Sequence, residues 1–204
     1  MKILANDGIS PEGVAALEKS GFEVSTVNVP QDKLIDAINT ENYVGVLVRS
    51  ATTVRAEVVD ACPGLKLIGR GGVGMDNIDV DYARSKGLHV VNTPGASSQS
   101  VAEMVMGNLF ALSRSLHDSY LQMPESGDTN FKVLKKKYGK GQELRGKTIG
   151  IVGFGRIGQS LASYALGVGM EVRAIDMQVN PVEIPLAING VGDLKVTLTP
   201  TNNL

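Results

Sequence analysis

The stretch that decides the fold is residues 147–158, KTIGIVGFGRIG. An apolar, β-branched run enters a glycine turn of the form G-x-G-x-x-G, and a helical stretch, RIGQSLASYALGVG, leaves it. The next strand pattern, MEVRAID, ends at Asp176. A strand, a glycine turn, a long helix and an acid at the end of the following strand are together typical of a dinucleotide-binding βαβ unit. The carboxylate of Asp176 suits two ribose hydroxyls and repels a 2′-phosphate, which favours NAD over NADP.

A second glycine stretch, GRGGVG at residues 69–74, fits the same pattern but predicts a different site. The segment behind it, DNID, is typical of a loop, and Gly87 already marks the end of any helix that follows. The position that should hold the acid is occupied by Asn92. Exposed amides of such a glycine run can bind an anion, with Arg70 beside them. The alternative is a glycine-rich turn without a ligand.

The first half of the chain predicts an α/β fold with a parallel sheet. Ser10 and Pro11 are typical of the cap and first residue of a helix. Strand patterns alternate with helical stretches, and they lie at KILAN (2–6), FEVSTV (22–27), YVGVLV (43–48), LKLIG (65–69) and LHVVN (88–92). This rhythm favours βαβ crossovers with helices on both faces of the sheet. The turn-rich residues 92–100, NTPGASSQS, interrupt the alternation and are interpreted as a hinge.

A long apolar helix is expected after the hinge, over residues 101–116. Ser100 and Glu103 have capping-box spacing, so we expect Glu103 to cap this helix rather than to act in catalysis. A helix that is apolar on most of its surface must be covered, which predicts self-association. Residues 119–144 are polar and are expected to form an irregular, solvated arm. Its lysine-rich part, residues 132–142, could alternatively bind phosphate groups or nucleic acid.

Composition narrows the class of partner. The chain has 204 residues, a formal net charge of −1 and 43% hydrophobic residues, which is typical of a globular protein. Near-neutral charge gives no case for nucleic acid, and no apolar run approaches the roughly 18 residues of a membrane span. A short apolar N-terminal run and a single cysteine, Cys62, are compatible with a cytoplasmic protein without disulfides. We expect a small-molecule partner and no bound metal.

Polar residues follow the predicted strands of the first half, where parallel sheets collect their ligands. These residues are Asn6, Asp7, Arg49, Ser50, Arg70 and Asn92. Because guanidinium forks suit carboxylate and phosphate oxygens, two arginines predict a small substrate with more than one negative charge. The alternative is a pair of surface arginines, each paired with a nearby acid.

Four stretches carry a resemblance to a known family, in this order and spacing: LVRSATTV (47–54), LKLIGRGGVGMDNIDV (65–80), VVNTPGASSQSVAE (90–103) and ELRGKTIGIVGFGRIG (143–158). Together they resemble the D-isomer-specific 2-hydroxyacid dehydrogenases, and most closely the branch that oxidises D-3-phosphoglycerate. The resemblance implies a flavodoxin-like substrate domain at residues 1–98. It also implies the first half of a Rossmann NAD-binding domain at residues 99–204, truncated relative to the family, and a homo-oligomer formed through that domain.

The resemblance also implies roles for individual residues. The substrate carboxylate would meet the backbone of Gly71, Gly72, Val73 and Gly74, and the substrate phosphate would meet Arg49, Ser50 and Arg70. Val73 would lie near the nicotinamide of NAD. The pyrophosphate would lie over Gly153, Gly155, Arg156, Ile157 and Gly158, and the adenosine ribose would bind Asp176.

The implied reaction is hydride transfer from C2 of 3-phosphoglycerate to NAD, giving 3-phosphohydroxypyruvate for serine synthesis. The family's catalytic histidine, its carboxylate partner and its arginine are expected beyond Leu204, so we expect this chain alone to be inactive. Neither histidine present matches the catalytic position: we expect His89 to pack within its sheet and His117 to lie at a helix C-terminus. The alternative function is a non-catalytic, NAD-binding regulatory protein of the same fold.

Overall fold

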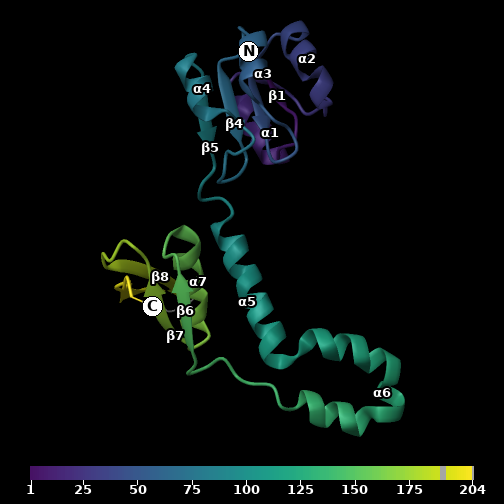
Figure 1. The fold of residues 1–204 in the computed structure, drawn as a ribbon, viewed down its shortest axis with the longest axis vertical. Coiled ribbons are helices and arrows are strands. Elements are labelled where there is room, and N and C mark those ends of the chain that lie inside the picture. Colours follow the sequence, from purple (N-terminus) through teal and green to yellow (C-terminus); the bar gives the residue numbers. More distant parts are fainter. Residues whose placement is uncertain (189–191, 204) are drawn as a thin grey trace. The chain divides into compact units, whose positions relative to one another are not determined.

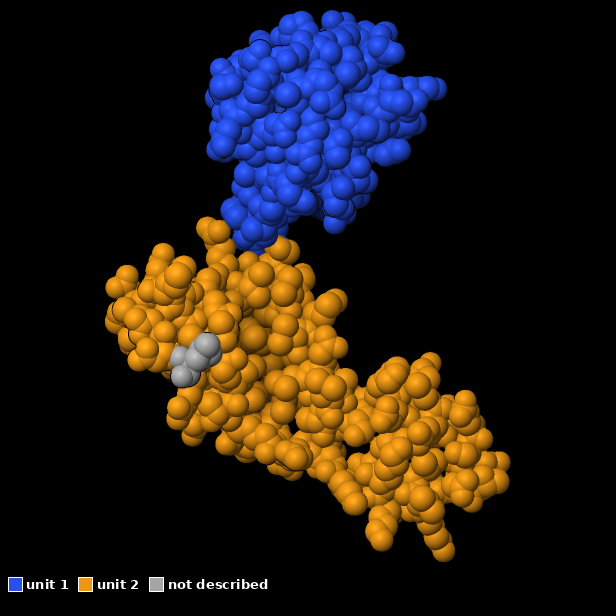
Figure 2. All heavy atoms as spheres, viewed as in Figure 1, with its two compact units in different colours: residues 1–96 blue, residues 97–204 orange. Residues whose placement is uncertain are grey.

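The computed structural model of the chain describes residues 1–188 and 192–203. The chain divides into two compact units, residues 1–96 and residues 97–204, which Figure 2 shows in different colours. We call them the first unit and the second unit. Each has its own cluster of buried apolar side chains.

The first unit is built on a five-stranded sheet whose neighbouring strands all pair in parallel (Figure 1). Its strands are β1 (Lys2–Ala5), β2 (Glu23–Ser25), β3 (Tyr43–Val48), β4 (Leu67–Arg70) and β5 (His89–Asn92). Their spatial order, β2-β1-β3-β4-β5, is the flavodoxin-like order. The prediction of a flavodoxin-like parallel sheet is therefore confirmed, and the order reverses direction between β1 and β3.

Helices connect these strands, as a parallel sheet requires. They are α1 (Pro11–Lys19), the 3₁₀ turn η1 (Gln31–Lys33), α2 (Leu34–Thr40), α3 (Ala56–Ala61) and α4 (Val80–Ser85). The predicted start of α1 is confirmed, because the Gly13 amide donates to the Ser10 hydroxyl at 3.2 Å and Pro11 is the first helical residue. Cys62 lies buried at the end of α3, and burial raises the pKa of its thiol, so it is an inert core residue.

The second unit contains the βαβ element that the GFGRIG stretch predicts. Strand β6 (Thr148–Val152) and strand β7 (Glu171–Ile175) pair in parallel and are joined by helix α7 (Arg156–Gly167). On the other edge of β7, Thr201 forms an isolated parallel bridge with Ile175. An antiparallel hairpin, β8 (Val182–Ile188) and β9 (Gly192–Leu198), comes after β7 along the chain. It contributes the buried side chain of Ile184 to the same core as α7.

Helix α5 (Ser98–Arg114) starts earlier than the capping-box pattern predicts. Ser97 precedes the helix and makes no side-chain capping bond, so the predicted cap at Ser100 is wrong. Glu103 lies inside the helix, where its carboxylate accepts hydrogen bonds from Gln99 at 3.2 Å and from the Tyr164 hydroxyl of α7 at 2.9 Å. The serines before residue 101 offer several possible starts, and spacing alone selects the wrong one.

The polar segment after α5 is helical, not irregular as its composition predicts. Helix α6 (Leu116–Tyr138) tolerates Pro124 in its interior and kinks at Asn130, which has non-helical backbone angles. Figure 1 shows the helix doubling back on itself at this kink. The carbonyl oxygen of the Gln122 side chain accepts hydrogen bonds from the Tyr138 hydroxyl at 2.7 Å and the Lys137 ammonium at 3.0 Å. These bonds between its two halves stabilise a helix that local propensity does not favour.

The packing of the hairpin on the second core gives a stability prediction. Ile184 is 0% exposed, whereas Leu194 on the partner strand is 48% exposed. We expect Ile184→Ala to lower the free energy of unfolding by about 2–5 kcal/mol, because it leaves a cavity in the core. Leu194→Ala is the matched control and should cost less than about 1 kcal/mol. Urea unfolding of the two variants checks this, and equal losses would show that the hairpin does not pack as described.

Candidate functional site

The strand ends of the first unit meet where the strand order reverses. Asn6 and Asp7 come directly after β1, and the segment Arg49–Thr52 comes after β3. The Asp7 carboxylate accepts hydrogen bonds from the Arg49 amide at 2.6 Å, the Thr52 amide at 3.1 Å and the Thr52 hydroxyl. Burial raises the pKa of this carboxyl, but the hydrogen bonds outweigh it and the pKa lies below its usual value. Asp7 is therefore charged at neutral pH and holds the segment that carries Arg49.

The side chain of Asn6 stabilises the same strand ends through its own hydrogen bonds. Its side chain is buried and donates to the Thr52 hydroxyl at 2.8 Å and to the Val29 carbonyl at 3.0 Å. Its side-chain oxygen accepts the Val29 amide at 2.7 Å. A buried polar side chain with all its groups hydrogen-bonded rigidifies its surroundings, so the ends of β1 and β3 form a fixed wall.

The glycine loop after β4 presents only part of its backbone to a ligand. The Gly71 amide donates to the Val48 carbonyl at 2.9 Å, and the Gly72 amide lies within hydrogen-bond distance of the Arg70 carbonyl and the Thr93 hydroxyl. The Asn92 side chain holds the Val73 carbonyl at 2.6 Å. Within the described residues, the amides of Val73 and Gly74 donate to no acceptor. Of the four backbone amides expected to contact an anion, only those of Val73 and Gly74 therefore remain available within the described residues.

Arg49 and Arg70 border this loop without acidic partners. Over residues 1–188 and 192–203, neither guanidinium forms an ion pair, whereas nearby Arg55 pairs with Asp79 at 2.9 Å. The structure thus does not support the alternative that these two arginines are neutralised by surface acids. Arg70 has one side-chain partner, Asn77, which accepts its Nε–H at 3.1 Å. Asn77 is the residue that sequence reasoning missed, because the loop pattern DNID gives no sign of where its side chain packs.

The second glycine motif ends at the N-terminus of α7. Gly155 precedes the helix, and Arg156 is its first residue. In the part of the chain that the structure describes, the amides of Arg156, Ile157 and Gly158 have no backbone acceptor. Unpaired amides and the helix dipole together favour a bound anion such as a pyrophosphate.

Two glycines of this motif are required by geometry. Gly153 has a φ of 92°, in the left-handed region that favours glycine. A Cβ on Gly158 would collide with the Gly153 carbonyl oxygen, so only glycine lets α7 approach the turn this closely. This is the close helix–strand contact that the third glycine of a dinucleotide motif provides.

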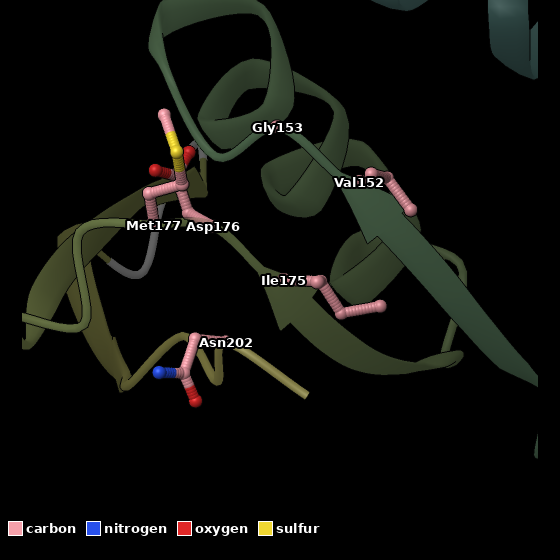
Figure 3. Close-up of a pocket in the computed structure, with 6 residues that line it drawn as sticks. All are labelled: Val152, Gly153, Ile175, Asp176, Met177 and Asn202. Atoms are coloured by element: carbon pink, nitrogen blue, oxygen red, sulfur yellow. The ribbon is translucent and has the colours of Figure 1, made fainter. Parts of the chain in front are cut away.

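Asp176 lies beside a hollow of about 270 Å³ at the ends of β6 and β7 (Figure 3). Its carboxylate accepts the Gln178 amide at 3.0 Å and the Phe154 amide at 2.6 Å, and these bonds lower the pKa of Asp176. A carboxylate can accept further bonds, so Asp176 still has acceptor sites for hydroxyl groups. The hollow is lined by Val152, Gly153, Ile175, Asp176, Met177 and Asn202. Apolar side chains with one carboxylate and one side-chain amide suit a nucleoside.

Both expectations about the surroundings of the two histidines are wrong. His89 is the first residue of β5, at the opposite end of that strand from Asn92, and its side chain is exposed on the same face of the strand as the exposed Val91. His117 lies in the first turn of α6, not at a helix C-terminus, because a new helix begins directly after α5. Among the described residues, no cluster of three or more potential ligands could hold a metal ion. None of the described helices is long and apolar enough to span a membrane.

Comparison with solved structures places this fold among known dehydrogenases. The TT0316 protein of Thermus thermophilus matches with a TM-score of 0.74 and 29% identity, over 89% of this chain and 58% of that one. The NAD⁺-bound 3-phosphoglycerate dehydrogenase of Entamoeba histolytica matches with a TM-score of 0.64 and 30% identity, over 87% of this chain and 54% of that one. These likenesses are consistent with a substrate domain followed by a partial Rossmann fold.

Curated relatives give the same family. A hydroxypyruvate reductase of Thermotoga maritima is 39% identical over 91% of this chain and 58% of the relative. A D-3-phosphoglycerate dehydrogenase of Methanocaldococcus jannaschii is 38% identical over 86% of this chain and 32% of the relative. The chain thus spans between a third and three fifths of these relatives. The family model for the catalytic domain of D-isomer specific 2-hydroxyacid dehydrogenases matches residues 3–197, and the chain belongs to that family.

Proposed function

We propose that this chain supplies the substrate-binding part and the adenosine-binding part of an NAD-dependent dehydrogenase for a phosphorylated D-2-hydroxyacid, with 3-phosphoglycerate as the substrate. One observation carries the proposal. Among the described residues, two arginines without acidic partners border two amides without acceptors, at the carboxyl ends of β3 and β4 and next to the switch point of a parallel sheet. A carboxylate fits the amides of Val73 and Gly74, and a phosphate fits Arg49 and Arg70, with Ser50 beside Arg49.

In this proposal residues 1–98 are the substrate domain and residues 99–204 belong to the NAD-binding domain. The free amides of Arg156 and Ile157 would hold the pyrophosphate and Asp176 the adenosine ribose. When bound, NAD would supply the hydride acceptor for oxidation at C2 of the substrate. The charge of Asp176 favours NAD over NADP.

Binding and orientation are the tasks that we assign to this chain. Oxidation of a hydroxyl also needs a base for its proton and a cation that polarises the forming carbonyl. His89 begins β5 at the end opposite Asn92, and neither histidine matches the catalytic position of the family, so we propose that neither is the base and that the 204-residue chain does not turn over by itself. A role in NAD sensing alone gives no reason for two unpaired arginines beside Val73 and Gly74. We therefore favour the enzyme over the regulatory protein.

Binding of 3-phosphoglycerate tests the substrate site. We expect Arg70→Ala to weaken the affinity measured by calorimetry by about tenfold or more, because a charge-assisted hydrogen bond contributes roughly 1.5–3 kcal/mol. Lys19→Ala is the matched control. It removes the same charge at the end of α1, which leads back to the amino ends of the strands, and it should leave the affinity unchanged. Absence of binding to the unaltered chain, or equal effects of both substitutions, would contradict the substrate assignment.

Binding of NAD tests the second glycine turn. Gly158→Ala should abolish detectable NAD binding, because the added methyl group collides with the Gly153 carbonyl and displaces α7 from the turn. Gly167→Ala, in the same helix, meets no atom within 4 Å and should bind NAD like the unaltered chain. Fluorescence titration with NADH measures both. Retention of full affinity in Gly158→Ala would sink the assignment of this turn to the pyrophosphate.

Self-association through the second unit is also proposed. Helix α5 buries Ala102 and Met106 against the core but leaves other large apolar side chains exposed, and α6 adds more. The exposed set includes Met104, Phe110, Leu112, Leu116, Tyr120, Leu121, Phe131 and Val133. Apolar surface of this kind on consecutive helices is typical of a protein interface.

Light scattering checks this expectation. We expect the chain to be a dimer or larger at micromolar concentration, and the double variant Leu112→Glu/Leu121→Glu to be a monomer, because it places two charges on the apolar surface. Val27→Glu, an exposed apolar residue of the first unit, is the control and should not change the mass. A monomeric unaltered chain would refute the interface.

A further inference from the structure

Asn77 is a buried polar side chain that joins the two segments bearing the arginines. It lies between the glycine loop and α4 and is 7% exposed. Its side-chain oxygen accepts the Nε–H of Arg70 at 3.1 Å. Its side-chain nitrogen donates to the carbonyls of Arg49 at 2.8 Å and Thr52 at 2.7 Å. Three hydrogen bonds from one amide therefore link the segments at the ends of β3 and β4.

The hydrogen bond to Asn77 determines which N–H groups of the Arg70 guanidinium can still bind a ligand. A Cβ on Gly72 would collide with Nη1 of Arg70, so the guanidinium lies against the bare backbone of the glycine loop. Asn77 takes the Nε–H, and the two Nη groups donate to no acceptor in the described ranges. An anion is then met by the terminal Nη1 and Nη2 donors, because Asn77 already takes the Nε–H of the side-on pair Nε and Nη2.

Asn77 also fixes the backbone of the segment Arg49–Thr52, which follows β3. Asp7 accepts the amides of Arg49 and Thr52, and Asn77 donates to the carbonyls of the same two residues. Both sides of this backbone are therefore fixed by buried or partly buried side chains. Asp7 reaches only this segment, whereas Asn77 reaches Arg70 as well.

We infer that Asn77 is a positioning residue of the proposed anion site. It orients Arg70 through Nε and fixes the backbone of Arg49, without contact to the ligand. A preorganised guanidinium loses less side-chain entropy when the anion binds, which strengthens binding. The inference rests on the proposed function, because it assigns Asn77 a purpose in recognition of the phosphorylated substrate.

A double-mutant cycle with 3-phosphoglycerate as the probe tests whether Asn77 acts through Arg70. In calorimetry, Asn77→Ala should weaken binding about tenfold in the unaltered background. In the Arg70→Ala background the same change should cost less than about threefold, because residues that act together are not additive. Asn39→Ala removes a side-chain bond to a backbone carbonyl elsewhere in the first unit and should change nothing. Equal factors in both backgrounds, or no loss in Asn77→Ala, would overturn the inference.

A second measurement needs no ligand. The Arg70 Nε–H signal in ¹⁵N-edited NMR, assigned by its loss in Arg70→Lys, should exchange slowly with solvent in the unaltered chain. It should exchange fast in Asn77→Ala and remain slow in Asn77→Asp, whose carboxylate still accepts the proton. The Asp variant also serves if the Ala variant does not fold, as judged by circular dichroism. Fast exchange in the unaltered chain refutes the orientation of Arg70. A slow signal without any binding of 3-phosphoglycerate refutes the proposed substrate, and with it the recognition role of Asn77.

Discussion

All neighbouring strands of the first sheet pair in parallel, and this constraint determines where the polar residues of the first unit gather. Their carboxyl ends lie at one edge, so Asp7, Arg49, Arg70 and Asn92 are brought together from four separate parts of the sequence. Side chains at these strand ends can then bond each other's segments, as Asp7 does with the amide of Arg49. Reversing any strand would remove its polar residue from this edge.

The two glycine turns show how the same pattern serves different purposes. After the turn at Gly153 the 12-residue helix α7 begins at Arg156. Its first amides, which have no backbone acceptor in the described ranges, and its dipole therefore point toward the glycine turn. After Gly74 the chain forms a loop and the six-residue α4. The amides of Gly71 and Gly72 already donate hydrogen bonds within the chain. In the function that we propose, the element behind the turn, rather than the glycines themselves, distinguishes a site for a pyrophosphate from one for a small carboxylate.

Features set by neighbours in sequence could be predicted, and features set by distant contacts could not. The strands, the cap at Ser10 and the turn at Gly153 arise from local patterns, whereas the flavodoxin-like order follows only from the family resemblance. The role of Asn77 depends on carbonyls of residues 49 and 52, which no local pattern connects to it. Helix α6 depends on bonds between its own halves through Gln122, and Glu103 is held by Tyr164 from another helix. His89 is exposed because it lies on the uncovered face of β5 with Val91, and the pattern LHVVN does not show which face of the strand is covered.

The central claim is that a phosphorylated hydroxyacid binds at the carboxyl ends of β3 and β4 in the first unit, and amide-resolved NMR tests it most directly. Titration of the full 204-residue chain with 3-phosphoglycerate should shift the amide signals of Val73 and Gly74 most, since these amides have no hydrogen-bond acceptor among the described residues. The amides of Gly71 and Gly72, already bonded within the chain, should shift much less. Shifts confined to other parts of the chain, or none at saturating ligand, would contradict the claim.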